Sequence, residues 1–175
     1  MSKKRRIIIG ITGASGAPFG IRMLEVLKPL AGIETHLVLS AAGSLNITLE
    51  TDWKVTEVEA LADVVHDVRN IAAPISSGSF KTDGMIVAPC SMKTLAGIVH
   101  SYGDNLITRA AAVVPKERRR LTLLVREAPL HTGHCKLMLE ASTLGAVIFP
   151  PVPAFYNRPA TLDDMRRSRG RGLHR

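Results

Sequence analysis

The stretch Ile7-Ile8-Ile9-Gly10-Ile11-Thr12-Gly13-Ala14-Ser15-Gly16-Ala17 decides the fold of this chain. An apolar run of strand length leads into a turn of small residues, and an apolar-periodic segment over residues 19–30 follows. This order is typical of strand, tight turn and helix. Glycines at positions 13 and 16 allow a ligand close to the backbone, and unpaired N–H groups at the start of a helix attract anions. We therefore expect a phosphate-bearing cofactor at this turn.

The glycine spacing differs from the two common phosphate motifs. Gly10, Gly13, Gly16 and Gly20 do not form G-x-G-x-x-G, and no Walker lysine follows them. The alternative interpretation is a purely structural strand-to-helix turn.

Apolar runs of strand length recur along the chain, and helix-like segments separate them. The runs cover residues 7–11, 35–39, 85–88, 121–125 and 146–149. The helix-like segments cover residues 19–30, 41–50, 58–62, 93–99, 106–114 and 134–144. Buried runs that alternate with helices indicate βαβ units and a parallel sheet covered on both faces. We predict an α/β three-layer fold in a single domain over residues 1–175.

The net charge of +8 and the pI near 10.0 come from the two ends of the chain. The first six residues carry four positive charges and residues 166–175 carry five, which leaves a net charge of −1 for the body. We expect mobile basic termini over residues 1–5 and 166–175, because chain ends are usually solvated. This distribution argues against a dedicated nucleic-acid surface.

The cysteine and histidine content indicates a reducing compartment and no metal. Cys90 and Cys135 form no CxxC pair, and Cys90 is interpreted as a buried small residue. His131 and His134 lack a third ligand at matched spacing, so no metal site is expected. No signal-like segment and no apolar stretch of about 18 residues is present, so we expect a cytoplasmic protein without a membrane span.

Polar and small residues follow directly after four of the predicted strands. They are residues 13–16, Ser40, residues 91–94, and the pair Arg126 and Glu127. Ligands of parallel sheets bind at the carboxyl ends of the strands, so these residues are expected to share one site. Hydroxyls and backbone amides at residues 91–94 suit an anion, although a plain helix cap by Ser91 is the alternative.

Three charged positions have a functional interpretation beside a structural one. Arg126 can grip a phosphate or a flavin carbonyl with two parallel N–H bonds, and Glu127 can act as a general acid. The alternative is a structural ion pair between them. Glu50 ends a predicted helix, where the dipole disfavours a carboxylate, so it has either a function or a chance solvated position. The run at residues 116–120 is interpreted as a solvated loop.

Seven motifs, in order, resemble those of the flavin prenyltransferase family, formerly described as aromatic-acid or polyprenyl-hydroxybenzoate decarboxylases. They are TGASGA at 12–17, LETD at 49–52, ISSGSF at 75–80, PCSMKT at 89–94, KERR at 116–119, REAPL at 126–130 and PPVPAFY at 150–156. The resemblance covers about residues 6–164. It implies a flavodoxin-like (Rossmann-like) parallel sheet, FMN bound between subunits, and trimers that build a dodecamer.

The resemblance also implies a reaction. Dimethylallyl phosphate alkylates reduced FMN at N5, and ring closure onto C6 gives prenylated FMN, the cofactor of a partner decarboxylase of ubiquinone or aromatic-acid metabolism. No metal is implied.

Matching by position implies three groups of site residues. The FMN-binding residues are Gly13, Ala14, Ser15, Ser40, Ser91, Met92, Lys93, Thr94 and Arg126. Arg109, Lys116 and Tyr156 face the prenyl phosphate. Ser15, Glu50 and Glu127 lie close to the reacting centre, where Glu127 supplies or relays a proton to the leaving phosphate. Lys116 thereby gains a function within its charged run.

The chain departs from the family after Asp164. The family's C-terminal helix continues and carries a phosphate-binding Arg or Lys, whereas this chain has Gly172 at that position and no helical apolar face. We expect this tail to weaken prenyl-phosphate binding. Two alternatives follow: an FMN-binding protein whose catalysis is impaired, and a flavoprotein cysteine decarboxylase. The latter class usually has an Asn-containing stretch where this chain has residues 90–94.

Overall fold

A parallel sheet forms the centre of the molecule in the computed structural model, which describes residues 4–153, 155, 158, 160, 161 and 164. The strands are β1 (Arg5–Ile11), β2 (Ile33–Leu39), β3 (Val64–His66), β4 (Gly84–Cys90), β5 (Arg120–Val125) and β6 (Val147–Ile148). Their order across the sheet is β3-β2-β1-β4-β5-β6, and every neighbouring pair is parallel.

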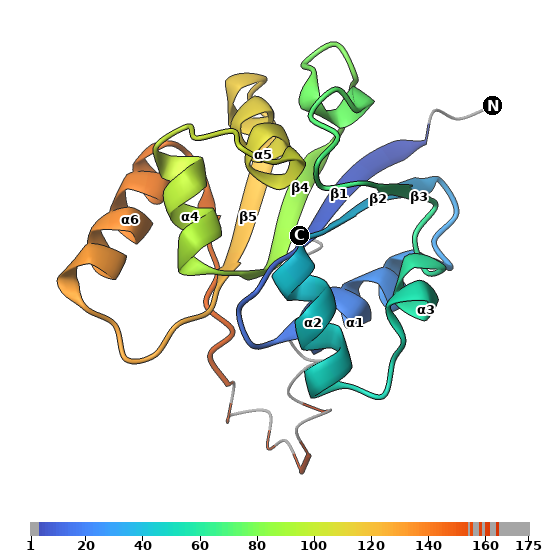
Figure 1. Ribbon diagram of the computed structural model, residues 1–175, viewed down its shortest axis with the longest axis horizontal. Helices are drawn as coiled ribbons and strands as arrows, with labels where there is room; N and C mark the ends of the chain where they lie inside the picture. Colours follow the sequence, from blue (N-terminus) through green and yellow to red (C-terminus); the bar gives the residue numbers. More distant parts are fainter. Residues whose placement is uncertain (1–3, 154, 156–157, 159, 162–163, 165–175) are drawn as a thin grey trace.

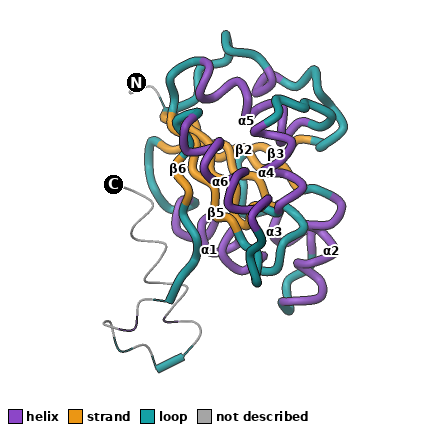
Figure 2. Tube along the Cα trace, turned by 90° about the vertical axis from the view of Figure 1, so that its left-hand side faces the viewer, coloured by secondary structure: helices purple, strands orange, loops and turns teal. Residues whose placement is uncertain are grey.

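Helices cover both faces of this sheet (Figures 1 and 2). One face carries α1 (Ala17–Leu27), α2 (Ala41–Glu50) and α3 (Val55–Glu59), and the other carries α4 (Met92–Val99), α5 (Leu106–Lys116) and α6 (Thr132–Thr143). A short 3-10 helix, η1 (Pro74–Ser76), lies between β3 and β4. The predicted α/β three-layer architecture is confirmed.

Successive residues of the central strands enter opposite cores, which explains why these strands have no apolar–polar alternation. Ile9 and Ile11 of β1 pack in the core under α1, whereas Ile8 packs in the core under α4, α5 and α6. In β4, Met85 and Val87 belong to that second core. Burial on both faces requires apolar side chains at every position, as expected for a parallel sheet with two helical layers.

The sheet reverses its winding direction between β1 and β4. From β1 the chain turns to α1 on one face, and from β4 it turns to α4 on the opposite face. The loops after these two strands therefore diverge and leave a crevice at the carboxyl edge of the sheet. This crevice is the position at which such folds bind ligands.

Two details of the predicted secondary structure are wrong. The sequence does not predict β3, because its apolar run is too short to be recognised. This strand has three residues at the edge of the sheet and pairs with β2. The helix expected over residues 58–62 lies at Val55–Glu59 instead. Arg5, within the terminus expected to be mobile, is the first residue of β1. Residues 166–175 lie outside the described residues. The single domain over residues 1–175 therefore stays a prediction.

Helix α1 approaches the sheet closely through Gly20, and this contact gives a stability prediction. A Cβ at this position would collide with the carbonyl oxygen of Ala88 and lie 2.7 Å from the side chain of Ile11. Because displacement of the Ala88 backbone would distort β4, we expect Gly20→Ala to lower the free energy of unfolding by about 1–3 kcal/mol in urea denaturation. Gly103→Ala is the control, since its Cβ meets nothing closer than 3.6 Å. Equal stability of the two variants would contradict this close packing.

A pair of histidines, the buried His36 and the half-buried His66, joins β2 to the edge strand β3. Nδ1 of His36 lies 2.9 Å from Nε2 of His66, and Nε2 of His36 lies 3.0 Å from the Glu34 carboxylate. Arg6 donates to the same carboxylate oxygen at 2.8 Å. Burial lowers the pKa of His66, and the neighbouring His36 lowers it further. His66 is therefore harder to protonate in the folded than in the unfolded protein.

This pKa shift predicts a loss of stability at mildly acidic pH. Below the unfolded pKa of about 6.5, the unfolded chain takes up a proton at His66 more readily than the folded chain does. Stability therefore falls as the pH decreases from 7.5 to 5.5, with a contribution of at most about 1.4 kcal/mol per pH unit. His66→Gln should flatten this slope in thermal denaturation, whereas the exposed His100→Gln should not. An unchanged slope in His66→Gln would contradict the prediction.

Candidate active site

Four loops meet at the carboxyl edge of the sheet and line two cavities. The smaller cavity, of about 330 Å³, is lined by Gly13, Ala14, Ser15, Ser91, Met92, Arg126, Glu127 and Ala128. The larger, of about 810 Å³, is lined from the predicted set by Gly13, Ser40, Ser91, Lys93 and Thr94. The two cavities share Gly13 and Ser91. All nine residues that the resemblance assigns to FMN thus line one continuous region, together with Glu127.

The turn after β1 lies directly against α2. A Cβ at Gly13 would collide with the Cβ of Ala42, so a side chain there would push the turn away from the helix. Ala14 is buried, whereas Ser15 is exposed and lines the smaller cavity. The turn thus presents bare backbone at Gly13 and a hydroxyl at Ser15 to the site.

Glu50 occupies the start of α1, where free amides were expected. Its Oε2 accepts hydrogen bonds from the backbone N–H groups of Gly16 at 2.8 Å and Ala17 at 2.9 Å. The expectation that these amides are unpaired and available to a phosphate is therefore wrong. The position of Glu50 at the end of α2 now has a reason, because the positive end of the α1 dipole offsets the unfavourable end of its own helix.

Asn46, one turn earlier on α2, holds the same turn. Its Nδ2 donates to the carbonyl oxygen of Ala14 at 2.9 Å. Asn46 and Glu50 are four residues apart, so they lie on one face of α2 and fix the turn from the same side. The role of Glu50 in holding the turn is structural, and its predicted catalytic role stays a prediction.

Serine side chains cap two of the helices whose first turns line the larger cavity. Ser40 Oγ accepts from Gly43 N at 3.0 Å and begins α2. Ser91 Oγ accepts from Thr94 N at 3.3 Å, donates to Thr94 Oγ1 at 3.1 Å, and begins α4. The capping interpretation of Ser91 is correct, and the cap also aims the start of α4 at the cavity.

Arg126 and Glu127 follow β5 and are both exposed. The backbone N–H of Arg126 donates to the carbonyl oxygen of Cys90 at 3.2 Å, which fixes this loop beside the loop after β4. Glu127 Oε1 accepts from the amide of its neighbour Ala128 at 3.1 Å. Within the described residues the two side chains form no ion pair with each other, and both residues line the smaller cavity.

The residues expected to face the prenyl phosphate do not join this region within one chain. Arg109 is exposed on α5, close to Gly103, but it lines neither cavity. Lys116 ends α5 at the opposite edge of the sheet, where it pairs with Glu117 at 3.3 Å and lines a separate cavity of about 250 Å³. Tyr156 lies outside the described residues, as does Gly172.

Sequence reasoning missed part of the larger cavity. Its remaining lining residues are Ala41, Ala42, Ala96, Gly97, His100, Tyr102, Asp104, Asn105 and Thr108. Asn105 Oδ1 caps α5 by accepting from Ile107 N at 2.9 Å and Thr108 N at 3.1 Å. The Asp104-Asn105 pair before an apolar helix was the available signal, because such residues begin helices whose first turn faces a loop region.

The cysteines and the paired histidines have structural explanations. Burial raises the pKa of the Cys90 thiol to about 12, so it is not a nucleophile at neutral pH, as predicted. His131 caps α6, because its Nδ1 accepts from Gly133 N at 3.0 Å. In the part of the chain that the structure describes, no three metal-ligating side chains gather into a cluster. Nor does any helix there have the length and apolar character needed to cross a bilayer.

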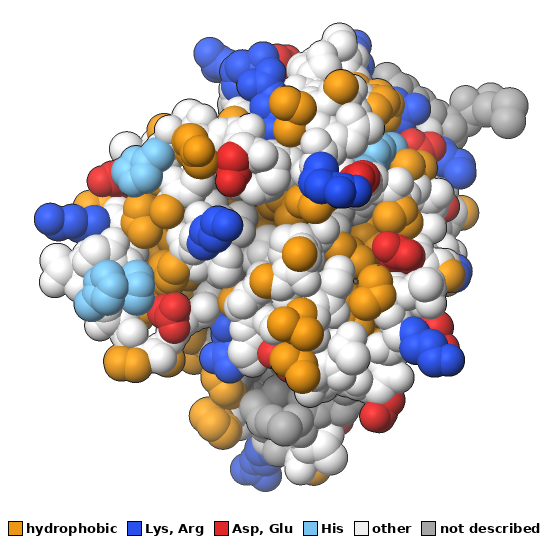
Figure 3. All heavy atoms as spheres, in the orientation of Figure 1, with side chains coloured by type: hydrophobic (Ala, Val, Ile, Leu, Met, Phe, Trp, Pro, Cys, Tyr) orange, Lys and Arg blue, Asp and Glu red, His pale blue; other side chains and the backbone are white. Residues whose placement is uncertain are grey.

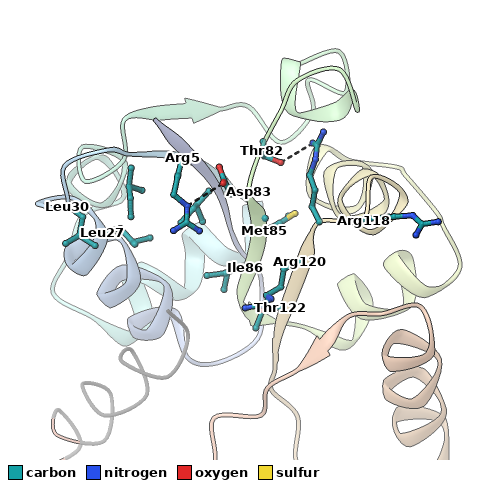
Figure 4. A pocket seen from close by; sticks show the side chains of 14 residues that line it. Arg5, Leu27, Leu30, Thr82, Asp83, Met85, Ile86, Arg118, Arg120 and Thr122 are labelled. Atoms are coloured by element: carbon teal, nitrogen blue, oxygen red, sulfur yellow. Dashed lines mark hydrogen bonds and ion pairs between the residues drawn. The ribbon is translucent and has the colours of Figure 1, made fainter. Parts of the chain in front are cut away.

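A further cavity, of about 680 Å³, lies at the amino ends of β4 and β5 (Figure 4). Arg5 pairs with Asp83 at 3.4 Å, and Arg119 donates to Thr82 and to the carbonyl oxygens of Gly78 and Phe80. None of the predicted site residues lines this cavity. On the face in Figure 3, positive and negative side chains are interspersed.

Comparisons with known proteins place the chain in a family. The model of the family Flavoprotein matches residues 1–164. The flavin prenyltransferase UbiX of Escherichia coli K12 is 63% identical over 161 residues, which are 92% of this chain and 85% of that protein. The chain belongs to the flavin prenyltransferase family.

Solved structures agree with this assignment. The structure of AnUbiX (PadA1) in complex with FMN and dimethylallyl pyrophosphate has a TM-score of 0.96 at 50% identity and covers 98% of this chain and 90% of its own. A dodecameric FMN-dependent UbiX-like decarboxylase from Escherichia coli O157:H7 has a TM-score of 0.93 at 52% identity. This match covers 94% of the present chain and 90% of the decarboxylase chain. The flavodoxin-like architecture implied by the resemblance is confirmed. A PPC decarboxylase mutant in complex with pantothenoylaminoethenethiol, at 16% identity and a TM-score of 0.67, covers 86% of this chain and 84% of its own and shares the fold alone.

Proposed function

We propose that this protein is a flavin prenyltransferase. It transfers a dimethylallyl group from dimethylallyl phosphate to N5 and C6 of reduced FMN and makes prenylated FMN for a partner decarboxylase. One observation carries this proposal: all nine residues assigned to FMN line two cavities that share Gly13 and Ser91. It is supported by family membership and by the relative that was solved with FMN and a dimethylallyl pyrophosphate.

The residues of the two cavities suit FMN chemically. The absence of a side chain at Gly13 keeps the turn packed against Ala42 of α2, and in this position the turn forms a wall of both cavities. The first turn of α4 offers the positive end of the helix and the Lys93 cation to a phosphate, while internal hydrogen bonds of Ser91 and Thr94 fix its position. Arg126 has an exposed guanidinium that can donate two parallel hydrogen bonds to a flavin carbonyl or a phosphate.

The transfer breaks the C–O bond between the prenyl group and phosphate and forms a C–N bond at N5. Ring closure then forms a C–C bond at C6, in which the prenyl alkene takes up one proton and C6 loses one. Reduced FMN supplies the electron pair, and the phosphate leaves with the electrons of the broken bond. Glu127 lines the smaller cavity and supplies or relays a proton to this phosphate. Ser15, at the exposed corner of the β1 turn, lies on the same cavity and orients the reacting ring. We assign no metal to this reaction.

The prenyl phosphate is held by residues of a neighbouring copy of the chain. Arg109 and Lys116 lie outside both cavities of their own chain, and Lys116 is at the opposite edge of the sheet. A solved relative is a dodecamer, and assembly of this chain into such a homo-oligomer would bring these cations to another subunit's site. Tyr156 belongs to the same proposed set. Two free cysteines agree with a cytoplasmic location.

The decisive experiment uses the purified protein under anaerobic conditions. It is incubated with reduced FMN and dimethylallyl phosphate, and the mass of the released flavin is measured. A flavin heavier by one prenyl unit supports the proposal. Tightly bound but unmodified FMN would overturn it in favour of an FMN-binding protein impaired by its tail at Gly172. Carbon dioxide released from a cysteine-terminated peptide would instead indicate a flavoprotein cysteine decarboxylase.

A further inference from the structure

Hydrogen bonds connect the loops that form the site across the whole carboxyl edge of the sheet. Ser40 N donates to the carbonyl oxygen of Ile11 at 3.0 Å and joins the β2 end to the β1 end. Arg126 N donates to the carbonyl oxygen of Cys90 at 3.2 Å and joins the β5 end to the β4 end. Both are backbone bonds, so among single substitutions only proline at the donor removes them. The remaining connection, between β1 and β4, crosses the crevice itself.

The side chain of Thr12 makes this central connection. Its Oγ1 donates to the carbonyl oxygen of Pro89 at 2.7 Å and accepts from the backbone N–H of Ser91 at 2.9 Å. The backbone N–H of Thr12 also donates to Pro89 O, at 3.2 Å. Thr12 is only 1% exposed, so water cannot replace either bond of the hydroxyl.

The two bonded loops meet at the residues that both cavities share. Gly13 follows Thr12 directly in the chain, and Ser91 donates its backbone N–H to the Thr12 hydroxyl. Gly13 and Ser91 are the two lining residues common to the smaller and the larger cavity. The Thr12 hydroxyl therefore sets the separation of the two walls between which the flavin is proposed to bind, and it sets the start of α4.

We propose that Thr12 is a positioning residue for FMN. It contacts neither cavity, and it acts by holding the Gly13 turn and the Ser91 helix start at the distance that flavin binding requires. This inference rests on the proposed function, because it takes FMN as the ligand. Without the hydroxyl, Ser91 N loses its acceptor, and beyond the end of the β1–β4 ladder at Gly10 and Val87 the backbone bond from Thr12 N to Pro89 O remains.

Thr35 provides a matched control within the same sheet. It is also 1% exposed, and its hydroxyl also accepts one hydrogen bond and donates another, from Asp63 N at 3.0 Å and to Asp63 Oδ2 at 2.9 Å. Thr35 lies on β2 five residues before Ser40, away from the carboxyl edge. Thr35→Val removes an equivalent buried hydroxyl without touching the site.

The experiment compares Thr12→Val, Thr12→Ser and Thr35→Val with the wild type. Tm, the Kd for FMN, and the kinetic constants for prenyl transfer are measured for each protein well below its Tm. We expect both valine variants to lose Tm. Only Thr12→Val should raise the Kd and the KM for FMN, by about tenfold, or about 1.4 kcal/mol, with kcat within about twofold of wild type. Thr12→Ser should restore the Kd to within about twofold.

Three results would overturn this inference. The first is an unchanged Kd in folded Thr12→Val, and the second is an equal rise of the Kd in Thr35→Val, which would indicate a general effect of stability. If Thr12→Val does not fold, Thr12→Ala replaces it in the experiment. The third result is that neither variant folds although Thr35→Val does, which would assign Thr12 to folding instead. The Kd for FMN does not require turnover, so failure of the prenyl transfer in wild type would refute the proposed function and leave this comparison valid.

Discussion

Glu127→Gln is expected to bind FMN like the wild type and to form prenylated FMN about 10²- to 10⁴-fold more slowly, the usual contribution of a general acid. The glutamine keeps the shape of the side chain and its acceptor oxygen, which can still accept from Ala128 N. It removes the transferable proton that the leaving phosphate requires. Glu127 lines the smaller cavity, and its one side-chain hydrogen bond among the described residues is to its neighbour Ala128, so the loss should fall on the rate and spare the affinity.

The measurement is the rate of prenylated FMN formation at saturating FMN, with the Kd for FMN determined separately. Glu140→Gln is the control, because Glu140 is an exposed glutamate of α6 outside both cavities. Turnover of Glu127→Gln at the wild-type rate would remove the acid role from this residue. A weaker Kd with an unchanged rate would instead assign Glu127 to binding.

Glu50→Ala is expected to destabilise the β1 turn and, with it, the folded protein. The substitution leaves Gly16 N and Ala17 N without the carboxylate that accepts their hydrogen bonds. Hydrogen bonds to charged groups contribute about 1.5–3 kcal/mol each. Because Glu50 is exposed, the lower value applies to each bond, and the loss of both should reduce the free energy of unfolding by about 3 kcal/mol. The Kd for FMN should rise as well, because the same turn carries Gly13 and Ser15.

Glu50→Gln separates the structural contribution from the predicted catalytic one. Its amide oxygen can still accept from both N–H groups, so most of the stability should return, although the favourable charge at the start of α1 is lost. Urea denaturation gives the stability and the prenylation assay gives the rate. Glu140→Ala is the control for general effects of losing a surface carboxylate. A Glu50→Ala variant as stable as the wild type would contradict the capping role.

The sequence predicted the central strands well, because burial on both faces favours apolar side chains along almost their whole length. The runs at 7–11, 85–88 and 121–125 correspond to β1, β4 and β5. It failed at β3, whose three residues at the sheet edge are half-buried or exposed and carry no such pattern. A strand that short is defined by its pairing with β2, which is a property of the folded chain.

The location of Lys116 could have been anticipated from the fold class. A helix that connects two parallel strands runs back along the sheet, so its last residue lies at the amino edge, away from the carboxyl ends that bind ligands. Lys116 ends α5 just before β5 and is found there. Its proposed role in binding the prenyl phosphate therefore requires a neighbouring copy of the chain.

The sequence by itself determined the parallel α/β fold and the set of residues that follow the strands, from the turn at residues 12–17 to Arg126 and Glu127. These features depend on local periodicity and on the rule that parallel strands end at one edge. Only the tertiary structure decided which groups in that set are available to a ligand. It placed the Glu50 carboxylate on the amides that begin α1, and the Thr12 hydroxyl between the two loops. These partners lie 33 to 79 residues apart in the chain, so their pairing follows from packing and cannot be read from either segment alone.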